Sequence, residues 1–220
     1  MFPNWTKNIL FLLVYMLSGL TLVIIIEGLL SGTELLPLNT AIEQAMIHLR
    51  TPFLTDLFVL VTKIGSPFIF SCVSLVIAIL LFLKKNIFDS ALLVVTILVS
   101  VVSLTVLKNV FQVSRPVNDF FSFTGWSFPS GHATMATAFF FITAYIFFNK
   151  VRSTAGKINL VAGSVLGILL VSVSRLYLGA HWTLDVLAGI ALGLLAVSFT
   201  VLVFNVFLEN WLQDKKKFGL

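Results

Sequence analysis

Three short segments hold most of the side chains in this sequence that could do chemistry. They are residues 108–116 (KNVFQVSRP), 129–132 (PSGH) and 174–185 (SRLYLGAHWTLD), and together they supply one lysine, two arginines, two histidines and one aspartate. Cationic side chains match the charge of a phosphate group, and histidine can attack phosphorus or transfer a proton. The three segments therefore predict a site for a phosphate group.

His181 and Asp185 are four residues apart, so on a helix they would share one face. The carboxylate could then accept the N–H of one imidazole nitrogen and leave the lone pair of the other nitrogen for a substrate. The alternative is a histidine that only satisfies a buried aspartate. The cations and the second histidine expected at the same membrane face favour the catalytic interpretation.

Ser130, Gly131 and His132 come directly before an apolar segment. Ser130 is well placed as a helix N-cap, Gly131 permits close approach of a ligand to the backbone, and the free N–H groups of a helix start bind anions. A simple cap would explain Ser130 but not a titratable His132 in the same turn.

Lys108 and Arg115 are seven residues apart, at the end of another apolar segment. Their alternative roles are ordinary ones, since lysine often extends from a helix end to the membrane interface and arginine can contact lipid headgroups. Pro116 turns the chain away from helix after Arg115, as expected of an ordered loop over a site.

The composition places these segments in a membrane protein. The chain is 59% hydrophobic and 10% charged, with a mean hydropathy of +1.07, whereas soluble domains carry about a quarter charged residues. The net charge of +5 comes from short loops between apolar segments, which favours membrane topology over binding of nucleic acid. The single cysteine, Cys72, excludes an intramolecular disulfide.

Six membrane spans are expected, at about 9–30, 67–83, 87–107, 131–149, 158–174 and 183–208. The first is long enough to be a retained span rather than a signal peptide. The apolar stretch 53–83 is too long for one span and is interrupted at Gly65-Ser66-Pro67, so 53–64 and 37–50 are predicted to be short interfacial helices. The expected fold is all-α, a single domain over 1–220 that forms an integral membrane six-helix bundle with short extracytoplasmic interfacial helices.

Loop charges predict the orientation of this bundle. Outside the three motif segments, two basic residues, Arg50 and Lys63, fall on one side. Nine fall on the side of the termini: Lys7, Lys84, Lys85, Lys150, Arg152, Lys157, Lys215, Lys216 and Lys217. By the positive-inside rule, both termini are expected to be cytoplasmic in a multi-pass cell-membrane protein, with the candidate site extracytoplasmic.

Two pairs of glycines, Gly163 with Gly167 and Gly189 with Gly193, lie in the last two predicted spans. Small residues four apart let helix backbones approach closely. The short link between these spans makes them antiparallel neighbours, and packing between them is favoured over a dimer interface. A monomer is therefore favoured, although the sequence does not establish the oligomeric state.

The pattern K-x-x-x-x-x-x-R-P, then P-S-G-H, then S-R-x-x-x-x-x-H-x-x-x-D resembles that of the type 2 phosphatidic acid phosphatase superfamily, in its membrane-integral branch. The resemblance implies that His181 is a nucleophile that forms a phosphohistidine, that Asp185 orients it and that His132 is the general acid. It also implies a metal-free reaction without other cofactors, and a set of groups that bind the phosphate: Lys108, Arg115, Arg175, Ser130 and the amide of Gly131.

The expected function is a metal-independent phosphatase or diphosphatase for lipid phosphates on the extracytoplasmic side. Candidate substrates are phosphatidylglycerol phosphate, phosphatidic acid and undecaprenyl diphosphate, and no groove for the lipid tail can be drawn from the sequence. One alternative is a lipid phosphotransferase that uses the same phosphoenzyme. Another is a non-enzymatic lipid-binding or transport protein, which would not need both histidines. Halide oxidation on bound vanadate occurs in soluble relatives, and the apolar segments here argue against it.

Overall fold

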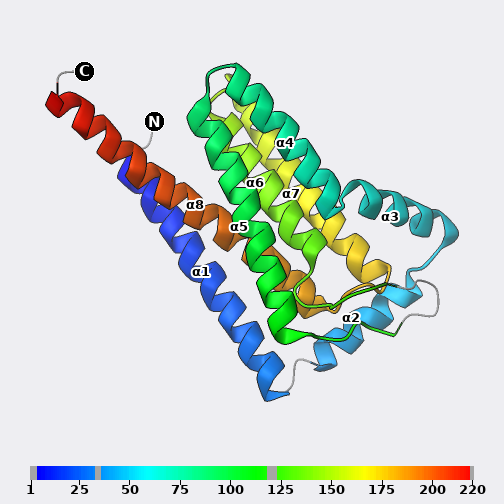
Figure 1. Ribbon diagram of the computed structural model, residues 1–220. Coiled ribbons are helices and arrows are strands. Elements are labelled where there is room, and N and C mark those ends of the chain that lie inside the picture. Colours follow the sequence, from blue (N-terminus) through cyan, green and yellow to red (C-terminus); the bar gives the residue numbers. More distant parts are fainter. Residues whose placement is uncertain (1–3, 33–35, 118–122, 219–220) are drawn as a thin grey trace.

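A computed structural model describes residues 4–32, 36–117 and 123–218, and within these ranges it contains helices and no strand. Figure 1 shows the helices in chain order: α1 (Asn4–Ser31), α2 (Leu36–His48), α3 (Pro52–Ile64), α4 (Pro67–Leu83), α5 (Ile87–Phe111), α6 (Gly131–Phe148), α7 (Thr154–Tyr177) and α8 (Thr183–Phe218). The all-α prediction is confirmed.

In the described part of the chain, five helices are long and apolar enough to cross a bilayer: α1, α5, α6, α7 and α8. A sixth span results if α3 and α4, which meet at an angle of 46°, are counted together. The predicted break at Gly65-Ser66-Pro67 is present: the Ser66 hydroxyl accepts a hydrogen bond from Ile69 N at 3.3 Å, and Pro67 begins α4. The structure therefore has α4 at 67–83 and a separate α3, as predicted.

Several helices extend beyond their predicted spans, and in α5 and α7 the extension includes a candidate site residue. Helix α5 continues through Lys108 to Phe111, and α7 continues through Arg175 to Tyr177. A basic side chain in the last turn of a helix interacts favourably with the negative end of the helix dipole. These cations therefore lie in the last turns of their helices, rather than beyond the helix ends.

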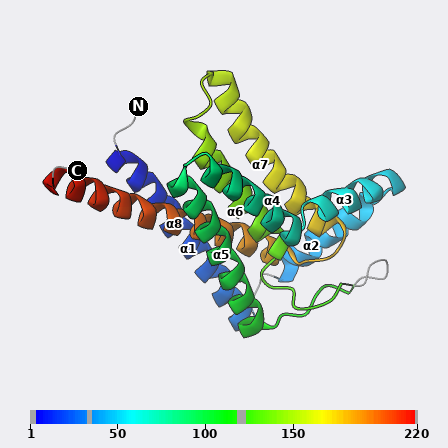
Figure 2. The same ribbon diagram turned by 45° about the horizontal axis from the view of Figure 1, so that its top comes forward.

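The chain termini and the three motifs lie at opposite ends of the bundle. In Figure 1 the start of α1, the end of α8 and the turn between α4 and α5 lie toward one end. Helices α2 and α3 lie at the opposite end, together with the loop after α5, and both contact α7 (Figures 1 and 2). This arrangement places all three motif segments at one end of the bundle.

Helix α6 packs against α4, α5, α7 and α8. Three of the four glycines singled out in α7 and α8 lie against α6 or its N-cap residue. An added Cβ at Gly189 would lie 2.6 Å from the backbone oxygen of Ser130, the N-cap of α6, and one at Gly193 would lie 2.7 Å from that of Thr134. An added Cβ at Gly167 would lie 2.5 Å from the Phe140 ring. Gly163 has open space beside it. Intramolecular packing is confirmed for these three, but the expected partner was wrong, because α6 separates much of α7 from α8.

Candidate active site

The site lies where the last turns of α5 and α7 meet the first turns of α6 and α8. The loop that joins α5 to α6 and the turn 178–182 between α7 and α8 complete it. Helix α3 closes one side through contacts with α7. All eight predicted site residues lie at this end of the bundle.

His181 is 5% exposed and lies in the turn just before α8. Its Nδ1 is 3.4 Å from Asp185 Oδ2, and its Nε2 is 3.2 Å from an Nη atom of Arg115. Asp185 also accepts a hydrogen bond from Trp182 N at 2.9 Å, as a residue at the third helical position commonly does. The predicted contact of His181 with Asp185 is present, although His181 precedes the helix.

Burial lowers the pKa of His181 to about 4, and the hydrogen bond and charge of Asp185 offset only part of this shift. The ring is therefore neutral at pH 7 and would gain its proton only as the pH falls toward 4. A neutral ring that donates from Nδ1 toward Asp185 has its lone pair at Nε2. This is the protonation state that a nucleophilic imidazole requires.

Arg115 and Lys108 hold the segment 125–127 beside His181. Arg115 donates to Gly125 O at 2.9 Å, to Trp126 O at 3.3 Å and to Ala180 O at 2.6 Å. Lys108 Nζ donates to Trp126 O at 2.6 Å and reaches Ser127 O at 3.5 Å. The two cations thus fix the loop before α6 against the turn that contains His181.

Arg175 is 4% exposed, and an Nη atom of its guanidinium donates to the hydroxyl of Thr62 in α3. Its Nε has no hydrogen-bond partner within the described part of the chain. The Phe123 ring lies 5.1 Å from the Arg175 guanidinium and 5.9 Å from that of Arg115. A buried N–H group without a partner is costly, so this Nε is available to an oxygen of a bound anion.

His132 is the second residue of α6 and hydrogen-bonds to the backbone of Thr62. Its ring is close enough to Arg175, His181 and Arg115 for electrostatic interaction. The structure therefore brings the two predicted histidines into one site, with cationic groups beside both.

Ser130 is the N-cap of α6, as predicted, and accepts from Ala133 N at 3.5 Å. Its own N–H donates to Asp185 O at 2.9 Å, which joins the starts of α6 and α8. An added Cβ at Gly131 would lie 3.3 Å from a Leu104 methyl group. Tight packing against α5 therefore gives a structural reason for this glycine, and the approach of a ligand to it stays a prediction.

Sequence reasoning missed three residues that contact the site: Ser127, Thr62 and Phe123. Ser127 donates to Asp185 Oδ2, and its hydroxyl lies 3.4 Å from His181 Nδ1. A serine three residues before Ser130, in a loop between motifs, was a usable signal. Thr62 gave no such signal, because it lies in an apolar stretch outside the motifs.

Within the ranges that the structure describes, no three His, Cys, Asp or Glu side chains are arranged to hold a metal ion. The arrangement instead combines three cationic side chains with a neutral imidazole and a second histidine. One N–H group of these cations, the Nε–H of Arg175, has no partner among the described residues. Cations can stabilise charge that develops on a phosphoryl group. The site can therefore bind a tetrahedral anion and attack it.

The sequence matches the family model described as the PAP2 superfamily over residues 89–209. The chain is 31% identical over 163 residues to phosphatidylglycerophosphatase B of Bacillus subtilis (strain 168), an alignment that covers 71% of this chain and 78% of that protein. It is 29% identical over 180 residues to an undecaprenyl-diphosphatase of Sulfolobus acidocaldarius, which covers 75% of this chain and 78% of that protein.

Two solved structures resemble the fold. The crystal structure of a transmembrane PAP2 type phosphatidylglycerolphosphate phosphatase from Bacillus subtilis superposes with a TM-score of 0.75 and 23% identity, covering 88% of this chain and 96% of that one. The crystal structure of Aquifex aeolicus LpxE gives a TM-score of 0.61 and 26% identity, covering 74% of this chain and 94% of that one. The helical membrane fold is thus shared with solved membrane proteins.

Proposed function

Because the chain belongs to the PAP2 superfamily, we propose that it hydrolyses lipid phosphates or diphosphates in the membrane through a phosphohistidine. One observation carries the proposal. The buried neutral His181 has one ring nitrogen against Asp185 and the other beside Arg115. An imidazole held in this way, next to cations that can bind phosphate, is arranged for attack on phosphorus.

In the first step, Nε2 of His181 attacks phosphorus and the bond from phosphorus to the leaving oxygen breaks. Protonated His132 gives its proton to that oxygen, which departs as an alcohol or as a lipid monophosphate. In the second step, His132 takes a proton from water, and the resulting hydroxide attacks the phosphohistidine. Inorganic phosphate leaves and His181 is restored. Asp185 orients the ring and offsets the positive charge that the ring gains when it is phosphorylated.

The phosphate oxygens would be bound by the N–H groups that the site leaves available. The unpaired Nε of Arg175 is one of them. Lysine has three N–H donors and arginine five, so Lys108 and Arg115 retain donors beyond those used on backbone carbonyls. Ser130 and the amide of Gly131 complete the proposed set at the start of α6, where the helix dipole favours an anion.

The names of the relatives suggest two classes of substrate, phosphatidylglycerol phosphate and undecaprenyl diphosphate, and phosphatidic acid is a third. The purified protein should release inorganic phosphate from at least one of them. Because the proposed chemistry needs no metal, activity should stay within about twofold in excess chelator. Vanadate should inhibit, since it stands in for five-coordinate phosphorus in the transition state. Loss of activity in chelator that a divalent ion restores would contradict the mechanism.

Lipid phosphotransfer remains the second candidate, because a phosphohistidine can pass its phosphoryl group to a hydroxyl instead of water. An added acceptor lipid decides between them. Hydrolysis yields inorganic phosphate whether or not the acceptor is present, whereas transfer yields a phosphorylated acceptor and less free phosphate.

We also propose that the site faces away from the cytoplasm. Outside the three motif segments, nine basic residues are assigned to the side of the termini and two to the side of the site. In a Cys72→Ala background, Val117→Cys should react with a membrane-impermeant maleimide in intact cells, since Val117 is 91% exposed in the loop beside the site. Ser153→Cys, exposed in the turn before α7, should react only after permeabilisation. The reverse pattern of labelling would contradict the orientation.

A further inference from the structure

Helix α2 places a carboxylate, Glu43, at the mouth of the site. Asn39 Oδ1 accepts a hydrogen bond from Leu184 N at 3.4 Å, in the first turn of α8. Glu43 follows Asn39 by four residues and therefore lies on the same face of α2. The contact made by Asn39 thus directs Glu43 toward the turn that contains His181.

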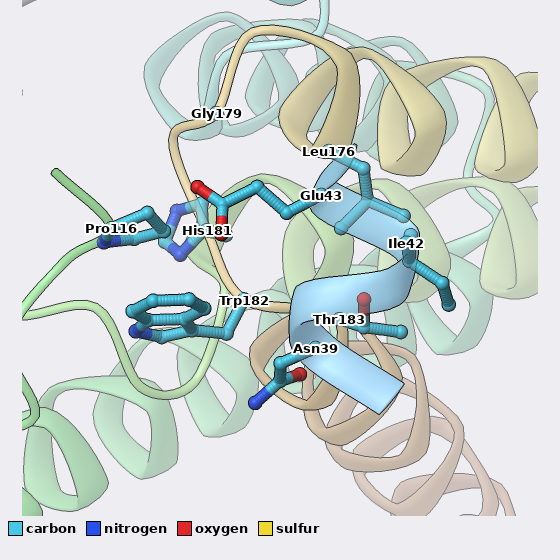
Figure 3. A pocket seen from close by; sticks show the side chains of 9 residues that line it. All are labelled: Asn39, Ile42, Glu43, Pro116, Leu176, Gly179, His181, Trp182 and Thr183. Carbon is cyan, nitrogen blue, oxygen red and sulfur yellow. The ribbon is translucent and has the colours of Figure 1, made fainter. Parts of the chain in front are cut away.

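Glu43 and His181 line the same narrow pocket, together with Asn39, Ile42, Pro116, Leu176, Gly179, Trp182 and Thr183. Figure 3 shows the Glu43 side chain extending from α2 toward His181, with Pro116 and Trp182 on the other side of the pocket. Among the residues that the structure describes, no basic group forms an ion pair with Glu43. This carboxylate is therefore free to act on whatever occupies the pocket.

A carboxylate beside a site for an anion is costly unless it has a partner on the substrate. A carboxylate accepts hydrogen bonds and has no proton to donate, so a hydroxyl group of the leaving group would satisfy it. A second phosphate at the same place would instead meet a like charge. Specificity often depends on such a repulsive element as well as on an attractive one.

We propose that Glu43 is a specificity-determining residue that accepts a hydrogen bond from a hydroxyl of the leaving group and disfavours diphosphates. The inference rests on the proposed phosphatase function and narrows its substrate class. In phosphatidylglycerol phosphate, a glycerol unit with a free hydroxyl separates the terminal phosphate from the next one. In a prenyl diphosphate, only one bridging oxygen separates the two phosphates. The preferred substrate is therefore a phosphate monoester whose leaving group carries a nearby hydroxyl.

The hydroxyl contact is tested with two lipids and two proteins. The lipids are phosphatidylglycerol phosphate and an analogue in which hydrogen replaces the free hydroxyl of the headgroup glycerol. Wild-type protein should show a kcat/KM about tenfold lower on the analogue, the size expected for a lost hydrogen bond to a charged group. In Glu43→Ala the two lipids should differ by less than about twofold. Equal discrimination by both proteins, or no discrimination by the wild type, would overturn the contact.

The charge is tested separately with Glu43→Gln, which keeps the size of the side chain. Its kcat/KM on a prenyl diphosphate, relative to phosphatidic acid, should rise roughly fivefold at low ionic strength, as expected when a partly exposed like charge is removed. Asp56→Asn is the matched control, because Asp56 is exposed on α3 at the same end of the bundle and its loss should leave the ratio unchanged.

An equal change on both lipids in Glu43→Gln would indicate a structural role and overturn the inference. The result for wild-type protein separates this failure from that of the proposed function. Wild-type protein that hydrolyses none of the lipids overturns the function and the inference with it. Wild-type hydrolysis without any effect of Glu43 on discrimination overturns the inference alone.

Discussion

Replacing His181 with alanine is expected to reduce turnover of a lipid phosphate by roughly 10⁵-fold or more, the scale on which loss of a nucleophile acts in well-studied enzymes. The same change should abolish the phosphoenzyme, because among the described residues no other ring nitrogen lies between Arg115 and Asp185. The measurement is incorporation of labelled phosphate after an alkaline quench, under which phosphohistidine survives, together with steady-state phosphate release.

His48→Ala is the matched control, since His48 is the one remaining histidine of the chain and is exposed at the end of α2. It should retain activity within about twofold and still form the phosphoenzyme. Labelled phosphoenzyme in His181→Ala would show that another group attacks phosphorus. Normal turnover without a phosphoenzyme in that variant would instead indicate that water attacks the bound lipid phosphate directly.

The spacing of the three motifs predicted much of the site, because helix ends place residues that are close in sequence close in space. His181 and Asp185 needed only the geometry of a helix start to meet. The break between α3 and α4 at Gly65-Ser66-Pro67 was equally predictable, since a capping serine followed by proline favours the start of a new helix. The helix boundaries at Lys108 and Arg175 were less predictable, because a basic residue at a span end can lie in the last turn or beyond it.

Contacts between motifs and distant segments were beyond what spacing can indicate. Thr62 touches both His132 and Arg175 only because α3 folds back against α7. Glu43 faces His181 because Asn39 attaches α2 to the start of α8. The glycines of α7 and α8 correctly predicted close packing between helices, but the helix they pack against is α6, whereas the prediction paired α7 with α8. A small residue shows that another helix approaches closely but not which helix it is.

Replacing His132 with alanine is expected to impair lipid substrates far more than an aryl phosphate. If His132 is the general acid, its proton is needed most by an alkoxide, which is a poor leaving group, and least by an acidic phenol. The first turnover on the lipid should therefore fall by about 10²–10⁴-fold, the range typical of general acid catalysis. The first turnover on the aryl ester should fall much less.

The first turnover is the informative quantity, because His132 is also proposed to activate the water that removes phosphate from His181. In His132→Ala the phosphoenzyme formed from an aryl phosphate should therefore accumulate, and its decay should be slow. The position of His132 beside Thr62, Arg175 and His181 supports both roles, and the two measurements separate them. Equal first-turnover losses on the two substrates would show that His132 is not the general acid. Rapid decay of the phosphoenzyme in His132→Ala would show that His132 is not the base that activates water.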